Sequence, residues 1–162
     1  MDVLGEMAGF FVAHAVWCVS DADTLTPIMA YRFADGSKQM VRIADEQLED
    51  AVRRGKDWLE HNPEAAAHAV LVFDGLITLA DGKTDALIVN ATDYGPPRLG
   101  FTMAIPYRPS DNPAGFAVYR PKFLDFEGSE PSWEALGEAF FRGVDQHEKG
   151  SAVWNASLDQ SR

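Results

Sequence analysis

Residues 69–91 constrain the fold most strongly, because they hold three short apolar stretches separated by two Asp-Gly dipeptides. An Asp-Gly dipeptide between apolar runs is a strong signal for a two-residue hairpin turn. The dipeptides are Asp74-Gly75 and Asp81-Gly82. We therefore expect three antiparallel strands over residues 69–73, 76–80 and 83–91.

Two-residue turns at both sites would fix which side chains share a face of this meander. Both faces are then largely apolar, whereas a sheet with one wet face alternates apolar and polar residues. Each face needs a cover, supplied by three helices of the chain or by helices on one side and a second copy on the other. The expected faces are Val70, Val72, Ile77, Leu79, Thr84, Ala86 and Ile88, against Leu71, Phe73, Leu76, Thr78, Asp85, Leu87 and Val89.

Four further strands are expected, two before this meander and two after it. Strands 26–33 and 38–43 flank Asp35-Gly36, another hairpin signal. Strands 99–107 and 115–120 are joined by a loop that contains proline and asparagine.

Three helices are expected, over residues 3–19, 45–61 and 132–148. The first is apolar on nearly every face, which is typical of a deeply buried helix. Asp45 is expected to cap the second helix, and Asn62-Pro63 to end it.

The resulting order, α-β-β-α-β-β-β-β-β-α, predicts an α+β protein with a largely antiparallel sheet of about six or seven strands built from hairpins, and three helices. A chain of 162 residues is long enough for one self-sufficient core. We expect a single domain over residues 1–162, with residues 151–162 as a polar C-terminal tail.

The charge balance narrows the choice of partners. Acids outnumber bases by 25 to 14, for a net charge of −11. Such a surface repels phosphate backbones and anionic lipids, so we expect neither nucleic acid nor membrane as a partner. The chain has one cysteine and an acidic N-terminal segment with Asp2 and Glu6, which favours a cytoplasmic protein over a secreted one.

Residues 98–122 run against this trend, with four cations and a single acid, Asp111. A hairpin centred on Asp111 would bring three of the cations together as a candidate site for a small anionic ligand. The alternative is that they neutralise the acidic helices packed beside them. The three cations are Arg98, Arg120 and Lys122.

The first helix carries small residues at four-residue spacing, Gly5, Gly9 and Ala13. Each glycine costs a helix roughly 1 kcal/mol relative to alanine, so the stripe indicates close packing. It is a candidate interface with a second copy; the alternative is tight docking onto the chain's own sheet.

His14 and Cys18 lie one helical turn apart, a spacing that suits two metal ligands or a thiol and its base. No further ligand stands at a recognisable spacing, and a buried cysteine near a helix C-terminus disfavours a thiolate. The chain also lacks the glycine-rich phosphate loops, zinc-protease and hydrolase motifs. We therefore assign no cofactor, no metal and no catalytic residue, and leave open whether the protein is an enzyme.

Two functions are expected from these features. The first is protein association, most simply self-association, because the sheet has two apolar faces and the first helix has a stripe of small residues. The second is recognition of a small anionic ligand, by a binding protein or an enzyme, through the 98–122 hairpin.

Overall fold

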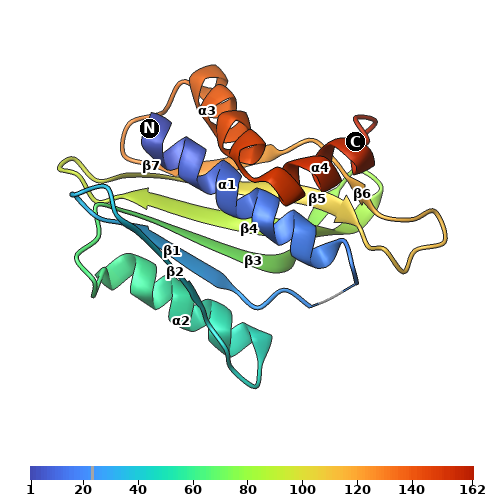
Figure 1. Cartoon of the computed structure of the whole chain (residues 1–162), viewed down its shortest axis with the longest axis horizontal. Coiled ribbons are helices and arrows are strands. Elements are labelled where there is room, and N and C mark those ends of the chain that lie inside the picture. The colour runs from blue at the N-terminus through green and yellow to red at the C-terminus, as the bar shows by residue number, and fades with distance from the viewer. Residues whose placement is uncertain (23) are drawn as a thin grey trace.

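A seven-stranded antiparallel sheet forms the middle layer of the protein (Figure 1). The structure is a computed structural model that describes residues 1–22 and 24–162. The strand order is β2-β1-β3-β4-β5-β6, and β7 pairs with β5 on the same side as β6. The strands are β1 (Ile28–Arg32), β2 (Lys38–Arg42), β3 (His68–Leu79), β4 (Gly82–Asp93), β5 (Leu99–Arg108), β6 (Ala117–Val118) and β7 (Lys122–Glu127).

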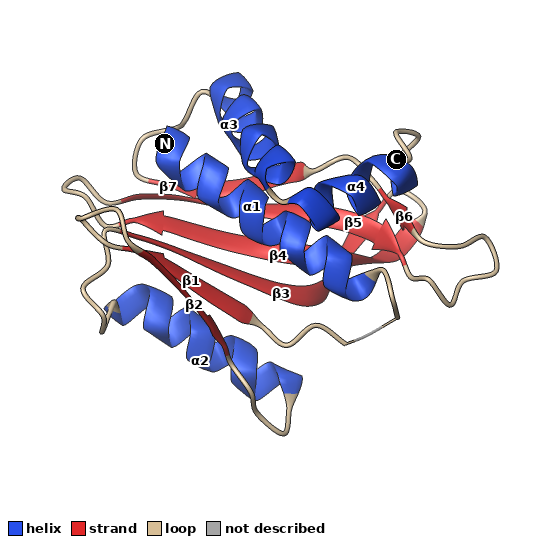
Figure 2. Ribbon diagram, in the orientation of Figure 1, coloured by secondary structure: helices blue, strands red, loops and turns tan. Residues whose placement is uncertain are grey.

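Helices cover both faces of this sheet (Figure 2). Three helices lie on one face, which we call the three-helix face, and one helix lies on the other, the α2 face. The three-helix face carries α1 (Asp2–Val19), α3 (Trp133–Gln146) and α4 (Glu148–Ser157), and the opposite face carries α2 (Leu48–His61). The predicted α+β fold with a largely antiparallel sheet is confirmed, with four helices instead of three.

Each face of the sheet is buried in a core of its own, so the prediction of two apolar faces is confirmed. Val70, Val72 and Leu87 belong to the cluster under α1, α3 and α4. Leu71 and Phe73 belong to the smaller cluster under α2. Both covers come from the same chain.

The predicted turn at Asp74-Gly75 is wrong. Residues 68–79 form one continuous strand, and the hairpin between β3 and β4 turns at Ala80-Asp81, because Leu79 pairs with Gly82. Asp74 remains in the strand because its carboxylate Oδ1 accepts a hydrogen bond, 2.8 Å long, from the Tyr107 hydroxyl on the same face of the sheet. A buried partner thus overrides a local turn preference.

Without that turn, the predicted assignment of side chains to faces changes beyond residue 73. Val72 pairs with Val89, and Phe73 pairs with Ile88. Val89 therefore shares the three-helix face with Val72, whereas the predicted register placed it on the opposite face.

The last two strands also differ from the prediction. The expected strand 115–120 is reduced to the two residues of β6, and β7 was not expected. The register between β5 and β7 shifts between Thr102 and Met103, which is a β-bulge. The bulge breaks the alternation of apolar and polar residues that marks a strand in sequence.

The C-terminal segment forms α4, where the sequence predicted only a polar tail. His147 ends α3 and also caps α4, because its ring nitrogen Nδ1 accepts a hydrogen bond, 2.9 Å long, from the Gly150 backbone. Trp154 of α4 is almost fully buried against α3, with its ring 6.1 Å from that of Phe140.

The small-residue stripe of α1 packs against α3 and α4 of the same chain. A methyl group built on Gly9 would lie 1.8 Å from the Phe140 carbonyl oxygen of α3, and one built on Gly143 would lie 1.8 Å from the Glu6 carbonyl oxygen of α1. A methyl group built on Gly150 of α4 would lie 2.2 Å from the Ala13 carbonyl oxygen of α1. The stripe is therefore a helix–helix contact, and we call it the α1 seam. Because α3 and α4 cover the seam, Gly5, Gly9 and Ala13 are buried within the chain.

We predict that Gly9→Ala destabilises the protein while Gly137→Ala does not. The added methyl group at Gly9 meets backbone atoms that cannot give way, and overpacking of this kind costs about 1–3 kcal/mol or more. Gly137 lies in α3 with open space around its Cα, so alanine there should stabilise by about 0.5–1 kcal/mol. Urea unfolding of both variants tests this, and a Gly9→Ala protein as stable as wild type contradicts it.

Candidate functional site

The structure does not bring the three cations of the 98–122 segment together. Arg98 immediately precedes β5, whereas Lys122 pairs with Ala104, six residues farther along, which is roughly 20 Å at 3.3–3.4 Å per residue. Arg120 lies farther still, because its neighbour Tyr119 donates a backbone hydrogen bond to Pro106. The predicted hairpin register, with Arg120 opposite Thr102, does not form.

Arg98 is already neutralised by carboxylates. Its guanidinium lies 2.8 Å from a carboxylate oxygen of Glu60 on α2 and 3.0 Å from one of Glu127 on β7. The Tyr94 ring packs against its other side, with the guanidinium carbon 5.5 Å from the ring centroid. Arg120 donates to the Arg162 carbonyl. For Arg98, these contacts match the alternative in which the cations balance nearby acids.

Arg98 also lines a groove of about 360 Å³ on the part of the α2 face that α2 leaves open. Its floor is polar, with Asn90, Thr92 and Thr102, and its walls carry charges of both signs. A sheet surface open to water is expected to be polar. The mixed charges do not single out an anion.

A different cluster of cationic and aromatic side chains forms at the C-terminal half of α1. His14 of α1 lies beside His147, the residue between α3 and α4, with Nδ1 of His14 3.1 Å from Nε2 of His147. Arg42 of β2 reaches the same ring, with its Nη2 3.4 Å from Nε2 of His14. Three segments far apart in sequence thus converge here.

The fold explains why these three side chains meet. Arg42 pairs with Ile28, whose fully buried side chain lies in the core under α1. Arg42 therefore extends toward the three-helix face, where α1 lies. His147 reaches His14 because the contact between Gly150 and Ala13 holds the start of α4 against α1.

The hydrogen-bond pattern fixes which nitrogens of the two imidazoles carry protons. The Gly150 N–H donates to Nδ1 of His147, so in the neutral ring the proton lies on Nε2. That Nε2–H donates to Nδ1 of His14, and the proton of a neutral His14 then lies on its own Nε2. This nitrogen faces Arg42, which is also only a donor.

Two donors thus face one another with no acceptor between them. Burial, His147 and Arg42 all lower the pKa of His14, and burial lowers the pKa of His147, so both rings are neutral near pH 7. An anionic oxygen placed beside both donors would accept from each of them. This donor pair, Nε2 of His14 and the Arg42 guanidinium, is the core of the candidate site.

A cleft of about 420 Å³ opens beside Arg42, and we call it the α1 cleft. Its volume lies within the usual range for small-molecule sites. Leu25 and Ile28 are buried in its wall, and Asp21 is exposed at it. The lining residues are Trp17, Cys18, Asp21, Thr24, Leu25, Thr26, Ile28 and Arg42.

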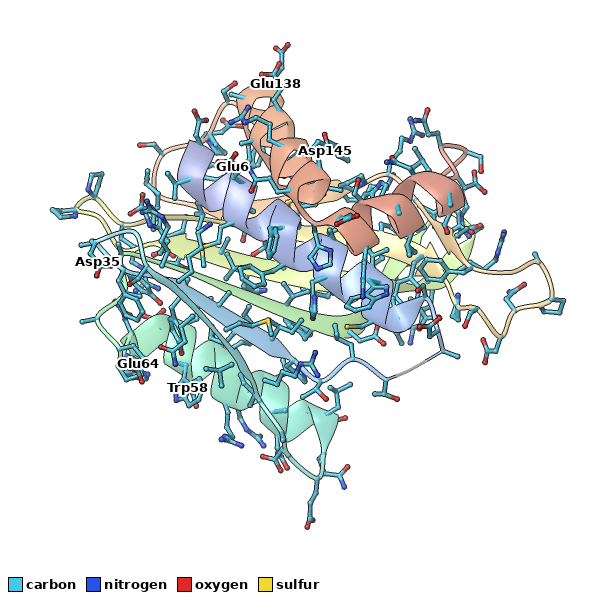
Figure 3. The ribbon with its side chains drawn as sticks, viewed as in Figure 1. Glu6, Asp35, Trp58, Glu64, Glu138 and Asp145 are labelled. Carbon is cyan, nitrogen blue, oxygen red and sulfur yellow. The ribbon has the colours of Figure 1, made fainter. Side chains whose placement is uncertain are left out.

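The neighbourhood of the cleft is locally cationic in an acidic protein. Lys149 lies over the Trp17 ring, 4.8 Å from its centroid. Among residues 1–22 and 24–162, no carboxylate forms an ion pair with Arg42 or Lys149. The acidic excess is spread over other elements, with Asp35 in the β1–β2 turn, Glu64 after α2 and Glu138 on α3 (Figure 3).

His14 and Cys18 do not form a metal site with other side chains of the described chain. Outside residue 23, no group of three or more His, Cys, Asp and Glu side chains is placed to hold a metal ion. Moreover, Nδ1 of His147 is committed to the Gly150 backbone, which leaves its Nε2 protonated instead of free to bind a metal.

Asp74 and Tyr107 form a second polar contact that the sequence did not predict. Burial raises the pKa of Asp74 and the pKa of Tyr107, and it is the largest cause of both shifts. They line a small cavity of about 180 Å³ together with Val19, Ala22 and Thr24. In the sequence, Asp74 had the signature of a turn residue, which hid this role.

No family model matches the chain, and no curated protein or solved structure matches it either. The site is therefore interpreted from its own geometry.

We predict that the stability of the protein falls as the pH drops from about 7.5 to about 5.5. The folded-state pKa values of His14 and His147 lie below the ordinary value of 6.5, so the unfolded chain binds more protons in this range. His68 acts in the same direction. Urea unfolding at several pH values measures this slope, and His14→Gln should reduce it. A slope of zero in the wild type contradicts the buried neutral pair.

Proposed function

We propose that this protein binds a small anionic ligand at the α1 cleft, as a binding protein or as the recognition half of an enzyme. One observation carries the proposal: Nε2–H of His14 and the Arg42 guanidinium are two donors 3.4 Å apart that share no acceptor. An anion satisfies both, and a charge-assisted hydrogen bond is roughly twice as strong as a neutral one.

The cleft supports this proposal better than the 98–122 segment does. Arg98 already has two carboxylate partners, whereas Arg42 has none among the described residues. Lys149 adds positive charge next to Trp17. The anionic ligand expected from the sequence is thus retained, and its proposed site moves from the 98–122 hairpin to the α1 cleft.

We predict that acetate raises the Tm of the wild type and of Arg120→Gln, but not of Arg42→Gln. A ligand at one hundred times its Kd stabilises the folded state by about 2.7 kcal/mol. For a chain of this size that is a Tm increase of roughly 5–10 °C. Thermal unfolding with acetate, against sodium chloride at equal ionic strength and against neutral acetamide, measures it.

Arg120→Gln is the matched control because it removes one arginine of the predicted 98–122 site and leaves the cleft intact. A loss of the acetate effect in Arg120→Gln and not in Arg42→Gln would return the site to the 98–122 hairpin. Equal effects in all three proteins would mean that acetate acts through the solvent and would refute the cleft.

Self-association is a second proposal, supported by an apolar surface at β7. Leu124 is 52% exposed and Phe126 is 41% exposed on this edge strand. The Phe126 ring lies 6.0 Å from that of Trp133, and Phe123 lies 4.9 Å from Trp133, so an aromatic cluster adjoins the edge. An exposed edge strand with apolar side chains is suited to pairing with another chain.

We predict a dimer in native mass spectrometry that Phe126→Lys dissociates. Leu76→Lys is the matched control, because Leu76 is also exposed but lies on β3, opposite Asp85. A monomeric wild type at tens of micromolar refutes self-association. A net charge of −11 repels nucleic acid and anionic membranes, so we propose neither as a partner. We also propose a cytoplasmic location.

A further inference from the structure

The wall of the α1 cleft is apolar next to Arg42, the member of the donor pair that lines the cleft. Leu25 is 3% exposed and Ile28 is fully buried, so both are fixed in the core and form a dry apolar wall behind the cleft. Trp17 adds an aromatic ring, held by contacts with His14 and His147 at centroid distances of 5.7 and 6.0 Å. The apolar body of a ligand gains free energy when it leaves water for contact with such a wall.

The charges around the cleft favour a ligand with one negative charge over a ligand with two. The donor pair supplies a single full positive charge, from Arg42, because His14 is neutral when its proton lies on Nε2. Lys149 adds a positive charge beside Trp17, and the Asp21 carboxylate in the lining offsets it. Asp21 lines the same cleft and repels additional negative charge. A second negative charge would therefore lie in an unfavourable position.

We infer that the α1 cleft takes a monocarboxylate with an apolar body, its carboxylate at His14 and Arg42 and its body against Trp17, Leu25 and Ile28. This inference rests on the proposed function and names the class of ligand. A carboxylate has two oxygens, enough to accept from both donors. The body of the ligand adds affinity through apolar burial alone.

A homologous series of carboxylates tests the apolar part. The probes are acetate, butyrate and hexanoate, with hexanol as the neutral counterpart, and the measurement is isothermal titration calorimetry on the full chain. Affinity should rise about threefold to fourfold for each methylene that becomes buried. Hexanol should bind at least tenfold more weakly than hexanoate, because the donor pair then lacks its charged acceptor.

The series separates this inference from the proposed function. If acetate and hexanoate bind with the same affinity, and Arg42→Gln abolishes both, the anion site stands and the apolar body is refuted. If none of the carboxylates binds, both proposals fail. If hexanol binds as well as hexanoate, the cleft is an apolar pocket and the anion site is refuted.

A phosphate monoester tests the preference for a single charge. Hexyl phosphate should bind more weakly than hexanoate at a pH above 7, where it is mostly a dianion. Asp21→Asn should narrow that difference, and Asp57→Asn, an exposed change on α2, should not. Tighter binding of hexyl phosphate to the wild type would overturn the preference for a monocarboxylate.

The one cysteine of the chain offers a second readout. Cys18 lines the cleft, so bound hexanoate should slow its alkylation by iodoacetamide, a neutral reagent. Arg42→Gln should abolish this protection. Protection that persists in Arg42→Gln would show that hexanoate binds without the guanidinium and would contradict the assigned position of the carboxylate.

Discussion

The backbone-to-backbone contact along the α1 seam is the constraint on which the rest of the structure depends. Glycine at positions 9, 143 and 150 lets α1 approach α3 and α4 so closely that a methyl group at any of them would collide with a carbonyl. Because α1, α3 and α4 pack so closely, the chain's own helices cover the three-helix face of the sheet. It also places the junction between α3 and α4 beside the middle of α1, where His147 meets His14.

The candidate site is a consequence of that packing. Because Nδ1 of His147 accepts a hydrogen bond from the Gly150 N–H to cap α4, the neutral ring carries its proton on Nε2, which donates to His14. His14 then faces the Arg42 guanidinium as a second donor. A structural cap at one end of the chain thus creates an unsatisfied pair of donors at the other end, in a protein whose overall charge would otherwise repel anions.

Much of the fold was accessible from sequence, because it depends on local patterns. The three predicted helices, the apolar character of both sheet faces and the hairpins marked by Asp35-Gly36 and Asp81-Gly82 all follow from spacing and turn chemistry. Asp74-Gly75 has the same local signal but a different outcome, because Tyr107, 33 residues away, bonds to Asp74 within the sheet. β7 escaped prediction because its bulge breaks the strand period.

The site was less accessible, because its members are joined only by tertiary contacts. His14 stood out in the sequence for its spacing to Cys18, yet its partner His147 lies 133 residues away. Arg42 belongs to the β1–β2 hairpin, which also carries three cations against one acid, but no local pattern joins that hairpin to His14. The cations that did stand out, Arg98, Arg120 and Lys122, are separated by the register of β5 with β7. A local excess of charge therefore did not locate the site, because only the folded chain shows which cations have carboxylate partners.

The most direct test of the donor pair is the tautomeric state of its imidazoles, measured by ¹⁵N NMR of histidine-labelled protein above pH 7. Protonated Nε2 with unprotonated Nδ1, in both His14 and His147, is the state that the hydrogen bonds require. His14 with its proton on Nδ1 would make Nε2 an acceptor for Arg42, leave no unsatisfied donor pair and contradict the anion site.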